Sequence, residues 1–231
     1  MNKLGNIASE VSAFSIFQSL TKSSIIELCQ SGEVITSKHH EYIFHYGEEA
    51  HYFGVVLSGA YKLCRPTSIG EDVIVYFSTP GDVVAAFIMA QPKPVYPVSV
   101  VSMGPSRFLK LPAEIYLQYW KKNSELVFRI QNLLSSRMNL LQDEKAMTRA
   151  PLSQKIAALL ISLVGKQTDK SALILPLPLT RREIADNMGS SVEAVIRIMS
   201  DWSKQGIIET NDQQIHILKP EKLIQEFSIS K

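Results

Sequence analysis

The chain has 231 residues, of which 45% are hydrophobic, 20% are charged and 8% are aromatic. This composition is typical of a folded globular protein and excludes a disordered chain. The 24 Lys and Arg residues nearly balance the 22 Asp and Glu residues, so the chain lacks the broad basic surplus common among nucleic-acid-binding proteins. The longest apolar runs, Val83–Ala90 and Ile156–Ile161, are shorter than the roughly 20 residues of a membrane-spanning helix.

The N-terminal segment has an early Glu10 and no continuous apolar run, so it does not resemble a secretory signal. We therefore expect a cytoplasmic protein. Cys29 and Cys64 are the two cysteines, and neither has a nearby partner in the sequence. This excludes a disulfide scaffold, a structural zinc site and a four-cysteine iron–sulfur cluster. Both cysteines are predicted to be small buried residues.

Residues from about Tyr42 to Leu111 are rich in Val, Ile, Tyr and Phe and are interrupted by Gly and Pro. This pattern is typical of short strands separated by turns. The predicted strands include Val55–Leu57, Tyr61–Leu63, Val73–Phe77 and Arg107–Leu111. They predict an antiparallel sandwich or roll.

A long helix is predicted after Pro112, over about residues 123–148, because apolar residues there form two stripes. One stripe would cover the strand-rich part, and the other would pair with the same helix of a second subunit in a parallel coiled coil. A helix buried on both sides within one chain has the same periodicity and is the alternative. The predicted dimer interface consists of Val127, Ile130, Leu133, Leu134, Leu140, Leu141 and Met147.

The segment Thr148–Pro151 interrupts the helical pattern, and Pro151 suits the first turn of a new helix. We place a domain boundary there, with residues 1–148 as the first domain and residues 151–231 as the second.

Two short helices separated by a turn at Gly189 are predicted within residues 180–206. Each has its own capping box, formed by Thr180 with Glu183 and by Ser190 with Glu193. The second helix exposes a polar N-terminal face, as a recognition helix does when it enters the major groove. Ile207–Thr210 and Gln214–Leu218, with a turn at Asn211–Asp212, then predict the β-hairpin of a winged helix.

The chain resembles the superfamily of the cyclic-AMP receptor protein and the fumarate–nitrate reduction regulator, which are dimeric bacterial transcription factors. The resemblance rests on the Pro80–Asp82 turn, the long helix, and above all Leu179–Ala185 through Ile207-Ile208. It implies an α+β fold with an N-terminal antiparallel β-roll, a long dimerisation helix and a C-terminal winged helix-turn-helix. It also implies a homodimer that binds a palindromic operator in double-stranded DNA, with RNA polymerase as a partner if the protein is an activator.

Glu193 and Arg197 occupy the positions that read bases in this superfamily. Arginine pairs with guanine and a carboxylate accepts a hydrogen bond from cytosine, which suits these roles. The positions that match the family's phosphate contacts are Thr180, Arg181, Arg182 and Ser191. For the two arginines the alternative is a solvated helix face. Val192 and Ile196 differ from the residues of the family's two main branches, so the outer bases of the half-site stay open.

The sensor half lacks the residues that bind cyclic AMP in the superfamily. Ala86 stands at the position of the family's Glu, and Tyr96, followed by Pro97, stands at the position of its Arg. On the long helix, Leu140 and Leu141 occupy the positions that face the same effector pocket. A buried cyclic phosphate would therefore have no cationic partner there, and we predict that cyclic AMP does not bind.

Two cysteines exclude the four-cysteine oxygen sensor of the fumarate–nitrate branch. A haem-based gas sensor is a further alternative, because a cluster of histidines, His39, His40, His45 and His51, could supply a ligand. These histidines have no fixed spacing, however, so we predict no metal and no cofactor. The spacing of His39-His40-Glu41 does not fit a cupin-type metalloenzyme, and nucleotide-binding loops are absent from the sequence, so we predict a protein without enzymatic activity. The remaining alternative is a sensor or protein-interaction module with a degenerate helix-turn-helix.

Overall fold

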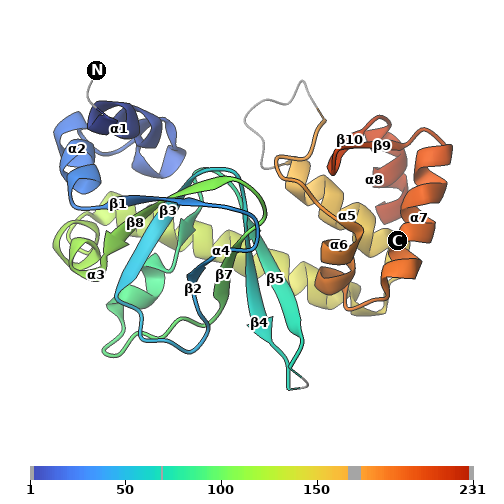
Figure 1. Cartoon of the computed structure of the whole chain (residues 1–231), viewed down its shortest axis with the longest axis horizontal. Helices are drawn as coiled ribbons and strands as arrows, with labels where there is room; N and C mark the ends of the chain where they lie inside the picture. Colours follow the sequence, from blue (N-terminus) through green and yellow to red (C-terminus); the bar gives the residue numbers. More distant parts are fainter. Residues whose placement is uncertain (1–2, 69, 166–172, 229–231) are drawn as a thin grey trace. The chain divides into compact units, whose positions relative to one another are not determined.

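A computed structural model describes residues 3–68, 70–165 and 173–228. The chain divides into two compact units, one from residues 1–66 and 75–139 and the other from residues 67–74 and 140–231 (Figure 1). The last turns of the long helix, from Leu140 onward, thus group with the C-terminal residues. The outer ends of the two predicted domains, at residues 1–2 and 229–231, lie outside the described residues.

The first unit is built on two four-stranded sheets, although the first three residues of β5 are grouped with the second unit. In one, the strand order is β1 (Glu33–Ser37), β8 (Ser106–Pro112), β3 (Tyr52–Ser58) and β6 (Val83–Val84). In the other, it is β2 (Tyr42–Phe44), β7 (Ser99–Ser102), β4 (Tyr61–Pro66) and β5 (Asp72–Ser78). The pairs β1–β8, β3–β8, β3–β6, β2–β7 and β4–β7 are antiparallel. The predicted antiparallel roll is confirmed.

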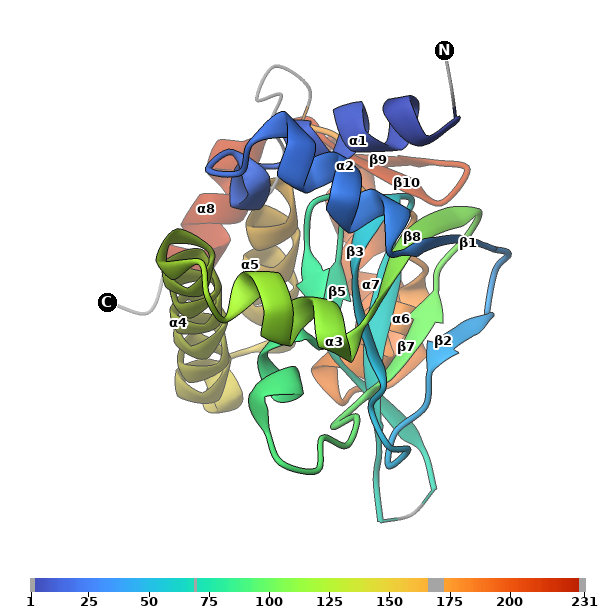
Figure 2. The ribbon, with the colours of Figure 1, turned by 90° about the vertical axis from the view of Figure 1, so that its left-hand side faces the viewer.

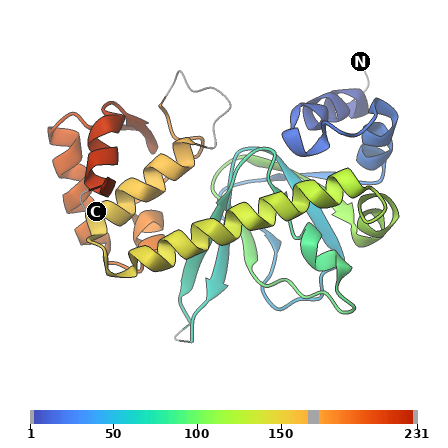
Figure 3. The same ribbon diagram turned by 180° about the vertical axis from the view of Figure 1, so that it is seen from behind.

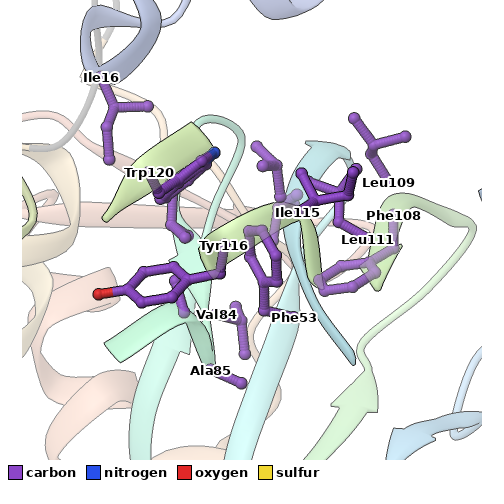
Figure 4. Close-up of a cluster of buried hydrophobic side chains, with 14 of the residues drawn as sticks. Ile16, Phe53, Val84, Ala85, Phe108, Leu109, Leu111, Ile115, Tyr116 and Trp120 are labelled. Atoms are coloured by element: carbon purple, nitrogen blue, oxygen red, sulfur yellow. The ribbon is translucent and has the colours of Figure 1, made fainter. Parts of the chain in front are cut away.

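Aromatic rings meet aliphatic side chains in the core of this unit (Figure 4). Phe53, Phe108 and Trp120 are fully buried, and the rings of Phe53 and Trp120 meet edge to face with their centroids 5.0 Å apart. Gly54 allows β3 to approach β8 closely, because a Cβ atom there would lie 2.2 Å from the carbonyl oxygen of Leu109. Packing of this kind fixes the register of the two central strands.

Two N-terminal helices, α1 (Lys3–Ala13) and α2 (Lys22–Gln30), pack against each other (Figure 2). They are additions to the predicted elements. An ion pair of 3.1 Å between Glu10 and Arg107 joins α1 to β8. Cys29 and Cys64 are both buried, as predicted, and burial raises the pKa of the Cys29 thiol to about 11.

The long helix α4 spans Ser124–Ala146, close to the predicted range of 123–148. The chain reaches it from β8 through α3 (Ala113–Ile115) and a π-helical turn (Tyr116–Trp120). The first part of α4 runs along the strand-rich unit (Figure 3), where Leu126 and Ile130 enter the core. Within the described ranges of the chain, no helix combines the length and the apolar character needed to span a membrane.

The second unit contains α5 (Leu152–Val164), α6 (Arg181–Met188), α7 (Val192–Lys204), the hairpin β9 (Ile208–Asn211) and β10 (Gln214–Ile217), and α8 (Pro220–Ser228). Helix α8 is a further addition to the predicted elements. Ile156, Leu160, Val195 and Met199 are fully buried at the centre of the unit. This core supports the two helices that the sequence singles out.

Candidate nucleic-acid interface

Helix α6 begins with the predicted capping box. The Thr180 hydroxyl accepts a hydrogen bond of 3.1 Å from the backbone N–H of Glu183. In return, the Glu183 carboxylate accepts bonds of 3.0 Å and 2.9 Å from the backbone N–H and the hydroxyl of Thr180. Glu183 is only 4% exposed. This reciprocal pair satisfies amide groups that would otherwise be unpaired at the helix start.

The second predicted capping box, Ser190 with Glu193, is wrong by one residue, because the N-cap of α7 is Ser191. Gly189 ends α6 in the left-handed conformation, with φ of +61°. The next amide, of Ser190, donates to the carbonyl of Ala185 over 3.1 Å, which completes a Schellman-type helix end. Ser190 therefore belongs to the end of α6, and Ser191 is the N-cap of α7, where its hydroxyl accepts from the amide of Ala194 over 3.3 Å.

Helix α7 is strongly amphipathic. Val195, Met199 and Trp202 are buried on one side, whereas Glu193 and Arg197 are exposed. Because the last two are four positions apart, they lie next to each other on the helix surface. In the part of the chain that the structure describes, neither side chain forms an ion pair. The predicted base-reading pair is thus open to a ligand.

The predicted wing is present, and its loop is shifted by one residue. Asn211 pairs with Gln214, so the two loop residues are Asp212 and Gln213 rather than Asn211 and Asp212. Both have positive φ, +47° and +65°, as a primed hairpin turn requires. The extended segment before α6 joins the hairpin, because the amide of Leu175 donates to the carbonyl of Ile215 over 2.9 Å.

The two arginines at the start of α6 have different environments. The Arg181 guanidinium donates to the hydroxyl of Thr210 on β9 over 2.9 Å, which joins α6 to the wing. Burial lowers the pKa of Arg181, although arginine stays protonated at neutral pH. Arg182 is 77% exposed and pairs with Asp186 over 3.2 Å. The solvated-face alternative thus fits Arg182 and is wrong for Arg181.

Comparisons with known proteins agree with this geometry in both halves of the chain. A model of the Crp-like helix-turn-helix domain matches residues 154–226, and a model of the cyclic nucleotide-binding domain matches residues 34–123. This chain belongs to the Crp/Fnr superfamily of transcription regulators.

Individual members of the Crp/Fnr superfamily match most of the chain. The transcriptional activator protein anr of Pseudomonas aeruginosa is 25% identical over 200 residues, which are 84% of this chain and 80% of that protein. The global nitrogen regulator of a Nostoc species is 26% identical over 201 residues, covering 84% and 89% of the two chains. The structure of FixK2 from Bradyrhizobium japonicum has a TM-score of 0.75 at 18% identity and covers 87% of this chain and 99% of its own.

The five effector-pocket candidates lie in different environments. Ala86 and Tyr96 are buried in the core of the first unit, and Pro97 is exposed. Leu140 lines a cavity of about 440 Å³ within the second unit, together with residues of α5, α6 and α8. Leu141 is 50% exposed.

Tyr96, one of the effector-pocket candidates, contributes to packing in the core of the first unit. Its ring stacks on Phe44 with centroids 4.4 Å apart. Its hydroxyl donates to the carbonyl of Tyr52 over 2.8 Å and accepts from the amide of the same residue over 3.2 Å. Burial raises the pKa of Tyr96 to about 12. The hydroxyl is thus fully engaged by the backbone of β3.

A cation that the sequence analysis missed faces the β-roll from α4. The Arg137 guanidinium lies 3.7 Å from the carboxylate of Asp82 and donates to the carbonyl of Val83 over 3.2 Å. It also lies 4.5 Å from the centre of the Tyr76 ring. The Arg137 and Asp82 side chains are 14% and 13% exposed. An arginine in a helix normally indicates a solvated face, so only the fold reveals this placement.

The four clustered histidines are exposed on the first unit. The ring of His45 stacks on Tyr42 with centroids 4.6 Å apart, and His51 lies 3.8 Å from Glu49. Among the residues with a described position, no group of three His, Cys, Asp or Glu side chains could hold a metal ion.

The predicted dimer-interface residues divide into two groups. Val127, Leu134 and Leu141 share one face of α4 at heptad spacing, joined by Met138, which is 56% exposed. Ile130, by contrast, is only 6% exposed and packs into the core of its own chain, so its assignment to the dimer interface is wrong. Leu133 and Leu134 also pack partly against that core, while Leu140 and Met147 line the cavity of the second unit.

The corrected N-cap gives a direct test of the turn. Ser191→Ala removes the cap of α7 and should lower the free energy of unfolding by about 0.5–2 kcal/mol. Ser190→Ala removes a buried hydroxyl that has no hydrogen-bond partner in the described chain, so it should change stability by less than about 0.5 kcal/mol or increase it. Urea denaturation followed by circular dichroism measures both. A larger loss from Ser190→Ala than from Ser191→Ala would contradict the observed cap.

Proposed function

We propose that the chain is a homodimeric regulator of transcription that binds specific DNA sequences by inserting α7 into the major groove. The observation that carries this proposal is the exposure of Glu193 and Arg197 on the side of α7 opposite the buried Val195 and Met199. The core of the second unit holds the helix, and the capped turn at Ser191 fixes where it begins. A helix held in this way can present the same side chains to each half of a palindromic operator.

Arg197 and Glu193 are the proposed base-reading residues. A guanidinium can donate two hydrogen bonds to O6 and N7 of guanine, and a carboxylate can accept from N4 of cytosine. The two side chains are neighbours on α7, so together they would read adjacent base pairs. The proposal thus assigns a G·C pair to each half-site.

Contacts to the DNA backbone would come from the start of each helix. Ser191 and Arg182 are the best-placed of the four predicted residues, because both are exposed, whereas Thr180 and Arg181 are partly buried. Phosphate contacts of this kind set affinity and register but not sequence choice. Each subunit of the dimer would make the same phosphate contacts.

The proposed dimer forms along the α4 face that contains Leu134, Met138 and Leu141. Exposed apolar residues at heptad spacing are typical of a coiled-coil seam. Two symmetry-related copies of α7 would then meet half-sites about 34–36 Å apart, one turn of DNA.

The first unit is proposed to sense something other than cyclic AMP and to use no cofactor. Arg137 lies beside the Pro80–Asp82 turn of the β-roll, and its guanidinium is already paired with the Asp82 carboxylate. A cyclic phosphate would have to displace this carboxylate and would still lack the family's own arginine, which Tyr96 replaces.

If the protein activates transcription, RNA polymerase would be its partner. A DNA-binding function also implies a cytoplasmic location in a bacterium.

The second candidate function is that of a protein-interaction module in which α7 contacts a protein rather than DNA. It is favoured by charge, because residues 151–231 have 10 Lys and Arg against 9 Asp and Glu. Such a module would not select a DNA sequence.

The base-reading role of Arg197 predicts a position-specific loss. On an operator selected from a random DNA library, Arg197→Ala should weaken binding by about 1–3 kcal/mol and should relax the choice of base at one pair of each half-site. Arg182→Ala is the control, because loss of a phosphate contact weakens binding to all sequences equally. Fluorescence anisotropy with single-base variants of the operator measures both. An equal loss on every sequence for Arg197→Ala would assign Arg197 to the phosphate contacts instead.

The dimer seam predicts a charge-sensitive oligomeric state. The double substitution Met138→Glu and Leu141→Glu should produce a monomer, because each half of a parallel seam would face like charges from the other. Asn132→Glu, at another exposed position of α4, should leave the dimer intact. Sedimentation velocity at micromolar concentration distinguishes the two states. A dimer that persists in the double variant would contradict the proposed seam.

A further inference from the structure

The second unit contains a cavity of about 440 Å³ that the proposed DNA contacts do not use. Its walls come from the end of α4, one side of α5, the end of α6 and α8, and from Met147 and Thr148 in the turn between α4 and α5. All the residues that line it belong to the second unit. The lining thus contains no residue of the β-roll and none of the proposed dimer seam.

Most of the wall of this cavity is apolar, with contributions from Leu140, Met147, Leu159 and Met188. Protein interiors contain few voids larger than a water molecule, and an open apolar space of this size leaves apolar surface in water. Apolar cavities of about 300–1,000 Å³ with a few polar groups are typical of small-molecule sites. The shape and the walls therefore suit a small ligand with an apolar body.

The charged groups of the lining favour a ligand with a positive charge. Asp143 and Glu144 bring two carboxylates from α4, and Lys155 brings one ammonium group from α5. Neither carboxylate forms an ion pair with any residue that the structure describes. Partial desolvation raises the pKa of the Glu144 carboxyl, and a cation bound beside it would lower this pKa again.

We propose that this cavity binds a small apolar amine, with the hydrocarbon body against Leu140, Leu159 and Met188 and the ammonium group beside Asp143 and Glu144. Burial of the hydrocarbon supplies most of the affinity, and the two carboxylates select the charge. Binding of the amine does not depend on the proposed function. Its consequence, regulation of DNA binding, rests on that function.

The regulatory consequence follows from the place of the cavity in the chain. Leu140 and Glu144 precede the turn between α4 and α5, and Lys155 and Leu159 follow it (Figure 3). Helix α4 carries the proposed dimer seam, and α5 packs against α6 and α8. A ligand that contacts both α4 and α5 favours the angle between them at which both contacts form. The bound amine should therefore change the affinity for DNA.

The test of binding uses three probes, octylammonium, octanol and octanoate, which share one alkyl chain and differ in charge. Isothermal titration calorimetry measures their affinities for the full-length protein in the absence of DNA. We expect one octylammonium to bind per chain, at least about tenfold more tightly than octanol, and octanoate to bind more weakly than octanol.

Two variants separate the charge of the site from its volume. The double substitution Asp143→Asn and Glu144→Gln keeps the side-chain shapes and should weaken octylammonium about tenfold, to the level of octanol. Its matched control is Glu209→Gln with Asp212→Asn, because this pair removes the same charge from exposed positions of the wing and should bind like the wild type. Ala158→Phe places a ring in the cavity and should abolish binding of octylammonium and octanol.

Three calorimetric results would overturn the proposed site. These are no saturable binding of octylammonium to the wild type, octanol or octanoate that binds as tightly as octylammonium, and an equal loss in the wing control. The double substitution keeps the test valid even if Ala158→Phe does not fold, because it changes no side-chain volume.

The regulatory consequence is tested by fluorescence anisotropy on a selected operator, with and without saturating octylammonium. The wild type should change its affinity for the operator by at least about fivefold, and Ala158→Phe should not respond, which excludes an effect of the amine on the DNA itself. An unchanged affinity of the wild type would overturn the regulatory role. Failure to select any operator would instead overturn the proposed function, while calorimetry without DNA still decides whether the cavity binds the amine.

Discussion

The packing of α7 is the constraint on which the proposed interface depends. Val195, Met199 and Trp202 bury one side of this 13-residue helix in the core of its unit, which leaves Glu193, Ile196 and Arg197 on the outer side. The helix cannot rotate to hide these three residues without exposing the buried ones. The start of α7 is equally fixed. The amide of Ser190 is bound in the Schellman-type end of α6, so Ser191 is the N-cap of α7. The bond from Arg181 to Thr210 then holds the wing against α6.

The first unit depends on a different balance of forces. Its core contains the buried rings of Phe53 and Trp120 and extends to Ile130 on α4. At the edge of that core, Arg137 brings a positive charge to Asp82 in a position where both side chains are largely shielded from water. Removing one member of such a pair costs more than removing both, because it leaves an unpaired charge. Arg137 and Tyr96 are thus both engaged in contacts within the first unit.

Much of the fold and of the candidate interface could be predicted from the sequence, because periodicity and capping residues act locally. The strands around Val55 and Phe108, the limits of α4 and the Thr180 capping box all follow from such local signals. The errors arise where two similar residues compete or where the partner is distant. Ser190 and Ser191 are both good N-caps, so only the backbone of the turn decides between them. Periodicity identifies Ile130 as apolar but does not say which surface covers it, and no local signal places Arg137 beside Asp82.

The chain has almost no net charge, so its affinity for DNA must come from a few cations placed at the interface. The most direct measurement is the dissociation constant for random DNA and for a selected operator across a salt series. We expect log affinity to fall linearly with log salt for both DNAs, by about 0.9 for each phosphate neutralised, and the operator to bind at least about 10³-fold more tightly than random DNA. Affinity that does not change with salt, or equal affinity for both DNAs, would contradict it.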